Sequence, residues 1–152
     1  MKSSTFVTRW IPAIAWMILI FLGSTDVLSA AQTSRFIVPF LRWLDPHISW
    51  AAINAILTAI RKLGHVTEYA ILAILLWRAL RGGRNLGTRM SLLFFTAWIA
   101  CSLFAASDEF HQSFVPSRTA SAHDVLIDIC GASIGLAICW MFAVRQKPQT
   151  IC

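Results

Sequence analysis

Three groups of polar residues in this 152-residue chain have the types and spacing that acid–base, anion-binding or metal chemistry requires. Lys62, His65 and Glu68 stand three residues apart, so a helix places them along one face. The other two groups are Asp108, Glu109, His111 and Gln112 in SDEFHQ, and Asp124 with Asp128 four residues later. Carboxylates and imidazoles can act as general bases or metal ligands, whereas Lys and Arg bind phosphate.

The segments that must position these groups are apolar runs of a size that can cross a membrane. The chain is 57% hydrophobic and 13% charged, whereas a soluble domain has about 25% charged residues. Polar groups this few cannot cover the apolar surface of the folded chain. We therefore predict that the chain is surrounded by lipid. The candidate spans are residues 10–23, 65–77, 90–106 and 125–144. Crossing takes about 20 residues, which the first two runs reach only with flanking residues. The first run also fits a signal peptide.

The segment 35–62 is predicted to be helical and to lie on the membrane or re-enter it. In SRFIVPFLRWLDP the apolar residues recur at helical spacing, with Arg35 and Arg42 on another side. ISWAAINAILTAIRK, 48–62, is again apolar and helical, and it either lies on the membrane or leads into the second span. We therefore expect an all-α, polytopic membrane bundle of about four transmembrane helices plus this segment. The whole chain, 1–152, is predicted to form one domain.

The distribution of Lys and Arg predicts the orientation of the spans. If the N-terminus is cytoplasmic, eight of the 13 basic residues fall on the cytoplasmic side and five outside. The short loop RALRGGRNLGTR, 78–89, holds four of the eight, and short loops weigh most in the positive-inside rule. We therefore predict that both termini are cytoplasmic.

In this orientation, all seven acidic residues and all four histidines lie outside or at the outer ends of spans. Glu68 and Asp128 lie deepest, about one turn inside. A carboxylate in a span costs about 2.5–3.5 kcal/mol even on the lenient insertion scale, so both must find partners in the bundle. The partners expected from the sequence are Lys62, His65 and Arg118.

Two stretches of the chain resemble the VanZ-like family of bacterial membrane proteins. They are KLGHVTEYAIL, 62–72, and ASDEFHQSFVPSRTASAHDVLIDICGASIG, 106–135. The matching residues, in order, are Lys62, His65, Tyr69, Ser107, Asp108, Glu109, Gln112, Pro116, Arg118, Asp124 and Gly131. The resemblance implies a compact bacterial inner-membrane protein of about four spans. The namesake of the family is linked to resistance to the glycopeptide teicoplanin, and the resemblance implies no known reaction.

We predict an extracytoplasmic polar site that binds or modifies a lipid-linked envelope component, with an effect on teicoplanin susceptibility. Its partners would be the lipid bilayer and a lipid-linked cell-wall precursor or a glycopeptide. The candidate binding residues are Lys62, His65, Glu68, Tyr69, Asp108, Glu109, Gln112, Arg118, Asp124 and Asp128. Whether the protein is an enzyme stays open, and the candidate catalytic residues are His65, Glu68, Asp108 and Glu109.

Several alternatives to this site stay open. HVTEY has the spacing of a His/Glu metal pair, and Asp108, Glu109, His111 and Asp124 could complete a divalent-metal site acting on a lipid headgroup. The same groups could instead form a structural network with no ligand. An ion path is disfavoured because the inner halves of the spans are apolar. Nucleic acid is not expected, because the basic residues form no single face.

One short motif concerns helix packing. Gly131 and Gly135 form a G-x-x-x-G in the fourth span, directly after Asp128. This spacing lets another helix approach closely. The partner helix could belong to the same chain or to a second copy, so an oligomer through these glycines is a further possibility.

Overall fold

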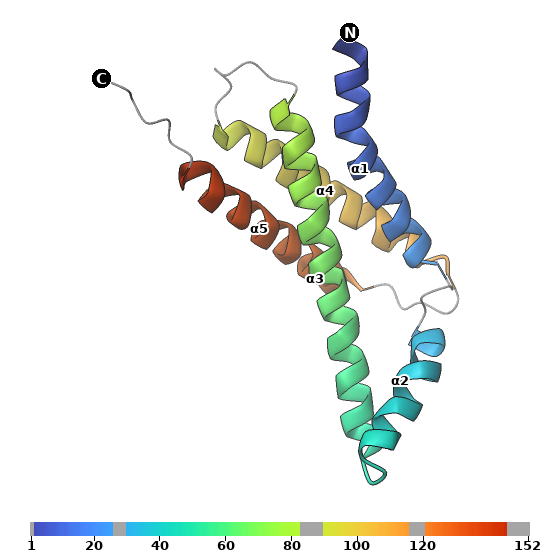
Figure 1. The fold of residues 1–152 in the computed structure, drawn as a ribbon. Helices are drawn as coiled ribbons and strands as arrows, with labels where there is room; N and C mark the ends of the chain where they lie inside the picture. Colours follow the sequence, from blue (N-terminus) through green and yellow to red (C-terminus); the bar gives the residue numbers. More distant parts are fainter. Residues whose placement is uncertain (1, 26–29, 83–89, 116–120, 146–152) are drawn as a thin grey trace.

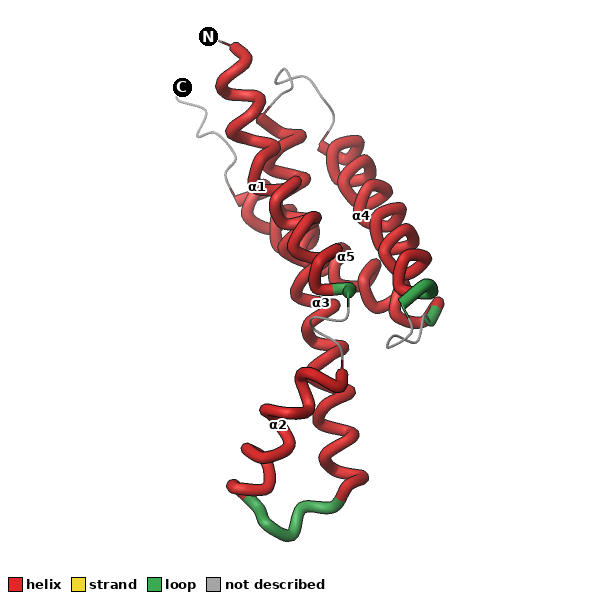
Figure 2. The backbone as a smooth tube through the Cα atoms, turned by 90° about the vertical axis from the view of Figure 1, so that its right-hand side faces the viewer, coloured by secondary structure: helices red, strands yellow, loops and turns green. Residues whose placement is uncertain are grey.

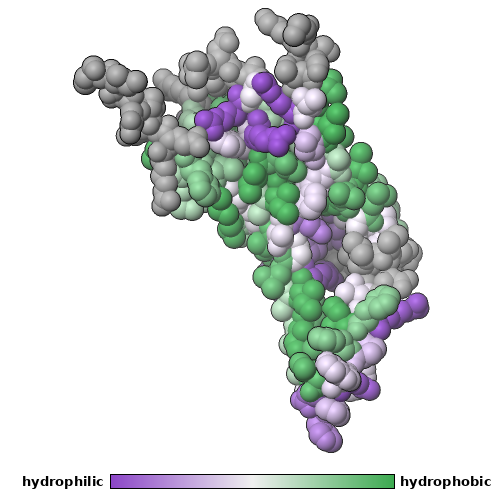
Figure 3. Space-filling view, viewed as in Figure 1, coloured by the Kyte–Doolittle hydropathy of each residue, from purple (hydrophilic) through white to green (hydrophobic). Residues whose placement is uncertain are grey.

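The computed structural model describes residues 2–25, 30–82, 90–115 and 121–145. Within these ranges the chain forms five helices: α1 (Lys2–Gly23), α2 (Ala30–Leu44), α3 (Trp50–Gly82), α4 (Met90–Gln112) and α5 (Ala122–Arg145). All of them except α2 are long and apolar enough to cross a membrane. The all-α fold with four spans is therefore confirmed, and the chain is a membrane protein. Figure 3 shows that hydrophobic surface covers much of the helices, with hydrophilic groups toward both ends.

The central helix of the molecule is α3, which packs against each of the other four. Its core face includes Tyr69, Leu72, Ala73 and Leu76, which stand at i, i+3, i+4 and i+7 and are buried. The small residues Ala97, Cys101 and Ala105 of α4 are also buried in this core, at four-residue spacing. Small side chains let the helices approach closely, so the bundle is tightest around the middle of α3.

The contact between α3 and α5 rests on the two glycines of the G-x-x-x-G motif. A Cβ atom on Gly131 would collide with the backbone of Val66, and one on Gly135 with the backbone of Ala70. The predicted close approach is therefore confirmed within the chain. Both glycines are buried, so an oligomer through them would have to displace α3.

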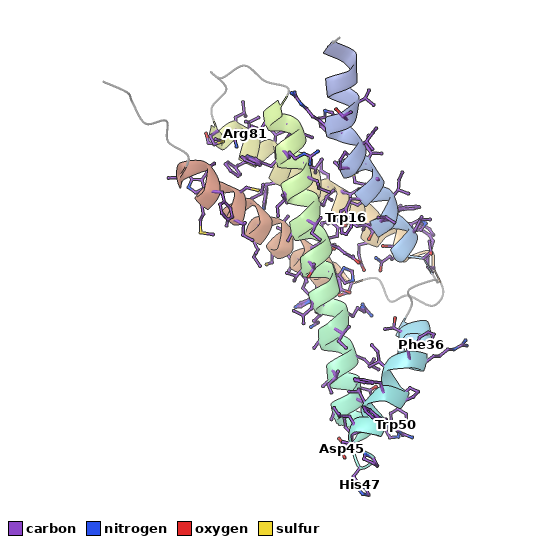
Figure 4. All side chains as sticks on the ribbon, in the orientation of Figure 1. Trp16, Phe36, Asp45, His47, Trp50 and Arg81 are labelled. Carbon is purple, nitrogen blue, oxygen red and sulfur yellow. The ribbon has the colours of Figure 1, made fainter. Side chains whose placement is uncertain are left out.

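The hairpin of α2 and the first turns of α3 extends beyond the end of the four-helix bundle (Figures 1 and 2). The 33 residues of α3 span about 50 Å at 1.5 Å per residue, well beyond the roughly 30 Å of membrane hydrocarbon. Figure 4 shows Asp45 and His47 at the tip of the hairpin, and Arg81 near the opposite end of α3.

The structure divides the predicted helical segment 35–62 between α2, which ends at Leu44, and α3, which begins at Trp50. Of the two alternatives for 48–62, the one that leads into the second span is correct, because α3 runs without interruption from Trp50 into that span. The Ser49 hydroxyl accepts a hydrogen bond from the Ala52 N–H at 3.2 Å and so caps the start of α3. Gly64 is the only glycine within the helix before its last residue, and one glycine costs a helix only about 1 kcal/mol.

Candidate functional site

Two pairs of charged or titratable side chains connect α3 to α5 at the end of the bundle next to the hairpin. Arg61 donates from a terminal guanidinium nitrogen to Oδ2 of Asp124 at 2.7 Å. One turn deeper, Nδ1 of His65 lies 3.0 Å from Oδ1 of Asp128. The spacing of four residues on both helices puts the pairs one above the other. Of the three partners expected for the deep carboxylates Glu68 and Asp128, His65 is the one that pairs with Asp128.

The start of α5 also carries a capping interaction next to the pair formed by Arg61 and Asp124. Ser121 precedes the helix, and its hydroxyl accepts a hydrogen bond from the His123 N–H at 3.2 Å. Asp124 lies in the first turn, where a carboxylate is favoured by the helix dipole. The Asp124 side chain is therefore held at the helix N-terminus, within reach of Arg61.

A third polar cluster connects the end of α1 to α4. The Ser24 hydroxyl donates to Oδ2 of Asp108 at 2.6 Å, and the Gln112 amide donates to the same oxygen at 3.0 Å. Gln112 also reaches the Ser24 hydroxyl at 3.1 Å. All three residues are buried, and Oδ1 of Asp108 has no hydrogen-bond partner. Ser24 lies 84 residues from Asp108 in the chain, so only the fold brings them together.

These clusters surround a cavity of about 550 Å³ between the hairpin and the bundle. Every described helix contributes to its lining or rim. The lining residues are Gly23, Ser24, Thr33, Asn54, Leu57, Thr58, Ile60, Arg61, Lys62, Gly64, His65, Glu68, Gln112 and Asp124. A cavity of this size, with polar groups converging on it, is typical of a ligand site.

One wall of the cavity is a polar stripe along α3, which we define as Asn54, Thr58, Arg61, His65 and Glu68. These residues are separated alternately by four and three positions, so they share one face of the helix. The stripe covers 15 residues, and its 14 helical steps span about 21 Å along the helix axis. Its outer end is neutral, its middle is cationic and its inner end holds an imidazole and a carboxylate.

The structure divides the predicted binding residues into three sets. Those that line the cavity are Lys62, His65, Glu68, Gln112 and Asp124. Those buried beside the lining are Asp108, behind Ser24 and Gln112, Asp128, behind His65, and Tyr69, in the core. Glu109 instead accepts a hydrogen bond from the Ser121 N–H and ties α4 to the start of α5. Arg118 lies outside the described residues.

The metal site considered from the sequence does not form. Within the described part of the chain, no three His, Cys, Asp or Glu side chains lie close enough together to hold a metal ion. Its proposed ligands have separate surroundings instead. Asp108 is bonded to Ser24, Asp124 to Arg61, and the His111 ring packs on Phe21 with centroids 4.2 Å apart. The helical spacing is present, but it does not bring Asp108, Glu109, His111 and Asp124 together, because the four residues have different neighbours.

Sequence reasoning missed the neutral lining residues, chiefly Ser24, Asn54 and Thr58. The signal for Asn54 and Thr58 was present, because they continue the spacing of Arg61, His65 and Glu68 toward the N-terminus. The apolar residues that surround Asn54 and Thr58 in the run 48–62 obscure this spacing. For Ser24, no local pattern in the sequence points to Asp108.

The cavity lining carries two cations, Arg61 and Lys62, and two carboxylates, Glu68 and Asp124, of which Asp124 is paired with Arg61. The Arg61 side chain is 38% exposed although it is in this pair. A guanidinium has five N–H donors, so the bond to Asp124 leaves others for a ligand. Phosphate oxygens suit such a fork of donors beside an ammonium group. The imidazole of His65 lines the same cavity and can accept or donate a proton there.

A protein-family model described as VanZ/LLP1 matches residues 9–143, which is most of the chain. The matched range contains every residue that lines the cavity. No curated protein and no solved structure matches the chain.

Proposed function

Because the chain belongs to the VanZ/LLP1 family of membrane proteins, we propose that it is a VanZ-like protein of the bacterial cell envelope whose cavity binds a phosphate-bearing, lipid-linked envelope component. The observation that carries this proposal is the pair Arg61 and Lys62 in a cavity of about 550 Å³ at the end of four spans. That cavity lies where a lipid headgroup meets a membrane protein.

The hairpin supports a ligand that comes from the membrane. On α2, Phe36, Phe40, Trp43 and Leu44 are exposed and fall on one helical face. Aromatic side chains of this kind are typical of the membrane interface, so we place α2 there. The cavity also has apolar lining from Leu57 and Ile60. A ligand with a charged head and an apolar tail suits both kinds of surface.

The positive-inside rule gives the orientation that this function requires. The start of α1, the end of α3, the start of α4 and the end of α5 lie at the end of the bundle opposite the cavity (Figure 1). Arg78 and Arg81, the described basic residues of the segment 78–89, lie at that end in the last turns of α3, so we propose that this end is cytoplasmic and that the cavity faces outward. The membrane is then the bacterial inner membrane, with both termini inside.

A single introduced cysteine tests this orientation. Ser113 is exposed, directly after α4 at the cavity end. In a variant that lacks the native cysteines, Ser113→Cys should react with a membrane-impermeant thiol reagent in intact cells. The matched control is Arg78→Cys, which should react only after permeabilisation. The reverse pattern would show that the cavity faces the cytoplasm.

The effect on glycopeptides tests the function in cells. We expect the chain to protect a teicoplanin-sensitive host, because the proposed ligand is an envelope component on the side where the drug acts. Lys62→Ala and Glu68→Gln, both in the cavity, should abolish protection at unchanged protein abundance, whereas Arg78→Ala at the other end of α3 should not. The minimum inhibitory concentration and a membrane immunoblot measure both quantities. No protection by the unsubstituted chain would contradict the glycopeptide role, and full protection by both cavity variants would assign these residues to structure.

A further inference from the structure

The pair formed by His65 and Asp128 has the arrangement of an oriented general base. Nδ1 of His65 lies 3.0 Å from Oδ1 of Asp128, and the Asp128 side chain is only 1% exposed. A carboxylate bound to one ring nitrogen fixes the orientation of the imidazole and stabilises its protonated form. The second ring nitrogen, Nε2, then points away from Asp128.

The same imidazole also lines the cavity. His65 both forms a hydrogen bond with buried Asp128 and is part of the cavity wall. It lies one turn deeper along α3 than Arg61 and next to Glu68 in the polar stripe. A phosphate group bound by Arg61 and Lys62 would therefore have an oriented imidazole on its deeper side.

We propose that the cavity is a hydrolytic site for a lipid diphosphate, with His65 as the general base and Asp128 as its positioning residue. This inference rests on the proposed function, because it requires a phosphate-bearing lipid in the cavity. His65 is the only one of these two residues that would touch the reacting atoms. Asp128 acts through His65 alone.

The reaction balances with water as the only co-reactant. Nε2 of His65 accepts a proton from a water molecule while the water oxygen bonds to the terminal phosphorus. The bond from that phosphorus to the bridging oxygen breaks, and the bridging oxygen keeps its electron pair. The products are a lipid monophosphate and inorganic phosphate, and His65 releases its proton to solvent. Arg61 and Lys62 would neutralise the charge on the phosphoryl oxygens.

A diphosphate fits this site better than a phosphate monoester of an alcohol. An alkoxide leaving group needs a proton from a general acid, whereas a phosphate leaving group departs as a stable anion. One oriented base is therefore enough for a diphosphate. The polar stripe is also long enough for two phosphates, because it extends about 21 Å along α3.

The test uses the purified full chain in lipid nanodiscs, with farnesyl diphosphate as the probe and release of inorganic phosphate as the readout. We expect steady phosphate release that His65→Ala lowers at least a hundredfold, which is the usual contribution of a general base. Asp128→Asn should lower kcat tenfold or more with little change in KM. The matched control is His47→Ala, an exposed histidine at the tip of the hairpin, which should leave the rate unchanged.

A structural role for the pair predicts different results. If His65 only supports the fold, exogenous imidazole cannot restore the rate of the His65→Ala variant, whereas a missing base should be partly replaced by free imidazole. Binding of farnesyl diphosphate without phosphate release would overturn the hydrolytic inference and leave the proposed binding function standing. Absence of binding would overturn both. Release that His65→Ala leaves intact would also overturn the assignment of His65.

Discussion

Replacing Gly131 or Gly135 with alanine should destabilise the protein by about 1–3 kcal/mol each, the usual cost of an overpacked interface. The Cβ of either alanine would overlap backbone atoms of α3, at Val66 or Ala70. A backbone carbonyl cannot rotate out of the way as a flexible side chain can. The two helices would have to separate, and the pairs that join α3 to α5 would loosen with them.

The measurement is reversible unfolding of the purified chain in mixed micelles, followed by the loss of helical signal. Gly64→Ala is the matched control, because a Cβ atom at that position would meet no atom within 4 Å. It should leave stability unchanged or raise it by up to about 1 kcal/mol, since alanine favours the helix. Unfolding of the two interface variants at the wild-type midpoint would contradict the close packing of α3 on α5.

Much of the fold could be predicted from the sequence, because each transmembrane helix contains a long apolar run. The four spans and the polar rim at one end follow from hydropathy and from the positions of the acids. The cost of a buried carboxylate predicted that Asp128 has a partner, with His65 as one of three candidates, and the choice among them needed the structure. The approach of a helix to Gly131 was predicted too, but the identity of that helix needed the structure.

The cavity itself could not be predicted, because it depends on how far one helix continues. Nothing in residues 48–62 shows locally that this helix and the second span are one straight element. Once α3 is continuous, Asn54 and Thr58 join the stripe of Arg61 and His65, and α2 folds back beside them. Ser24 meets Asp108 only through the packing of α1 on the bundle, since 84 residues separate them in the chain.

Binding of a lipid phosphate to the purified chain should depend strongly on the two cations of the cavity. Hydrogen bonds to charged groups contribute about 1.5–3 kcal/mol each, and 1.4 kcal/mol is tenfold in affinity. Loss of both Arg61 and Lys62 should therefore weaken binding about a hundredfold or more. Arg61→Ala also leaves Asp124 without the partner that it has in the structure, so the helical signal of the variant must be checked first.

The direct test of the central claim is the affinity of the chain in nanodiscs for farnesyl diphosphate compared with farnesol, which has the same tail without phosphate. The wild-type chain and the Arg78→Ala control should bind the diphosphate, and both should bind farnesol far more weakly. The double variant Arg61→Ala/Lys62→Ala should lose this preference while it keeps its helical signal. Equal affinity of the wild-type chain for the two lipids, or undiminished diphosphate binding by the double variant, would contradict a phosphate site in the cavity.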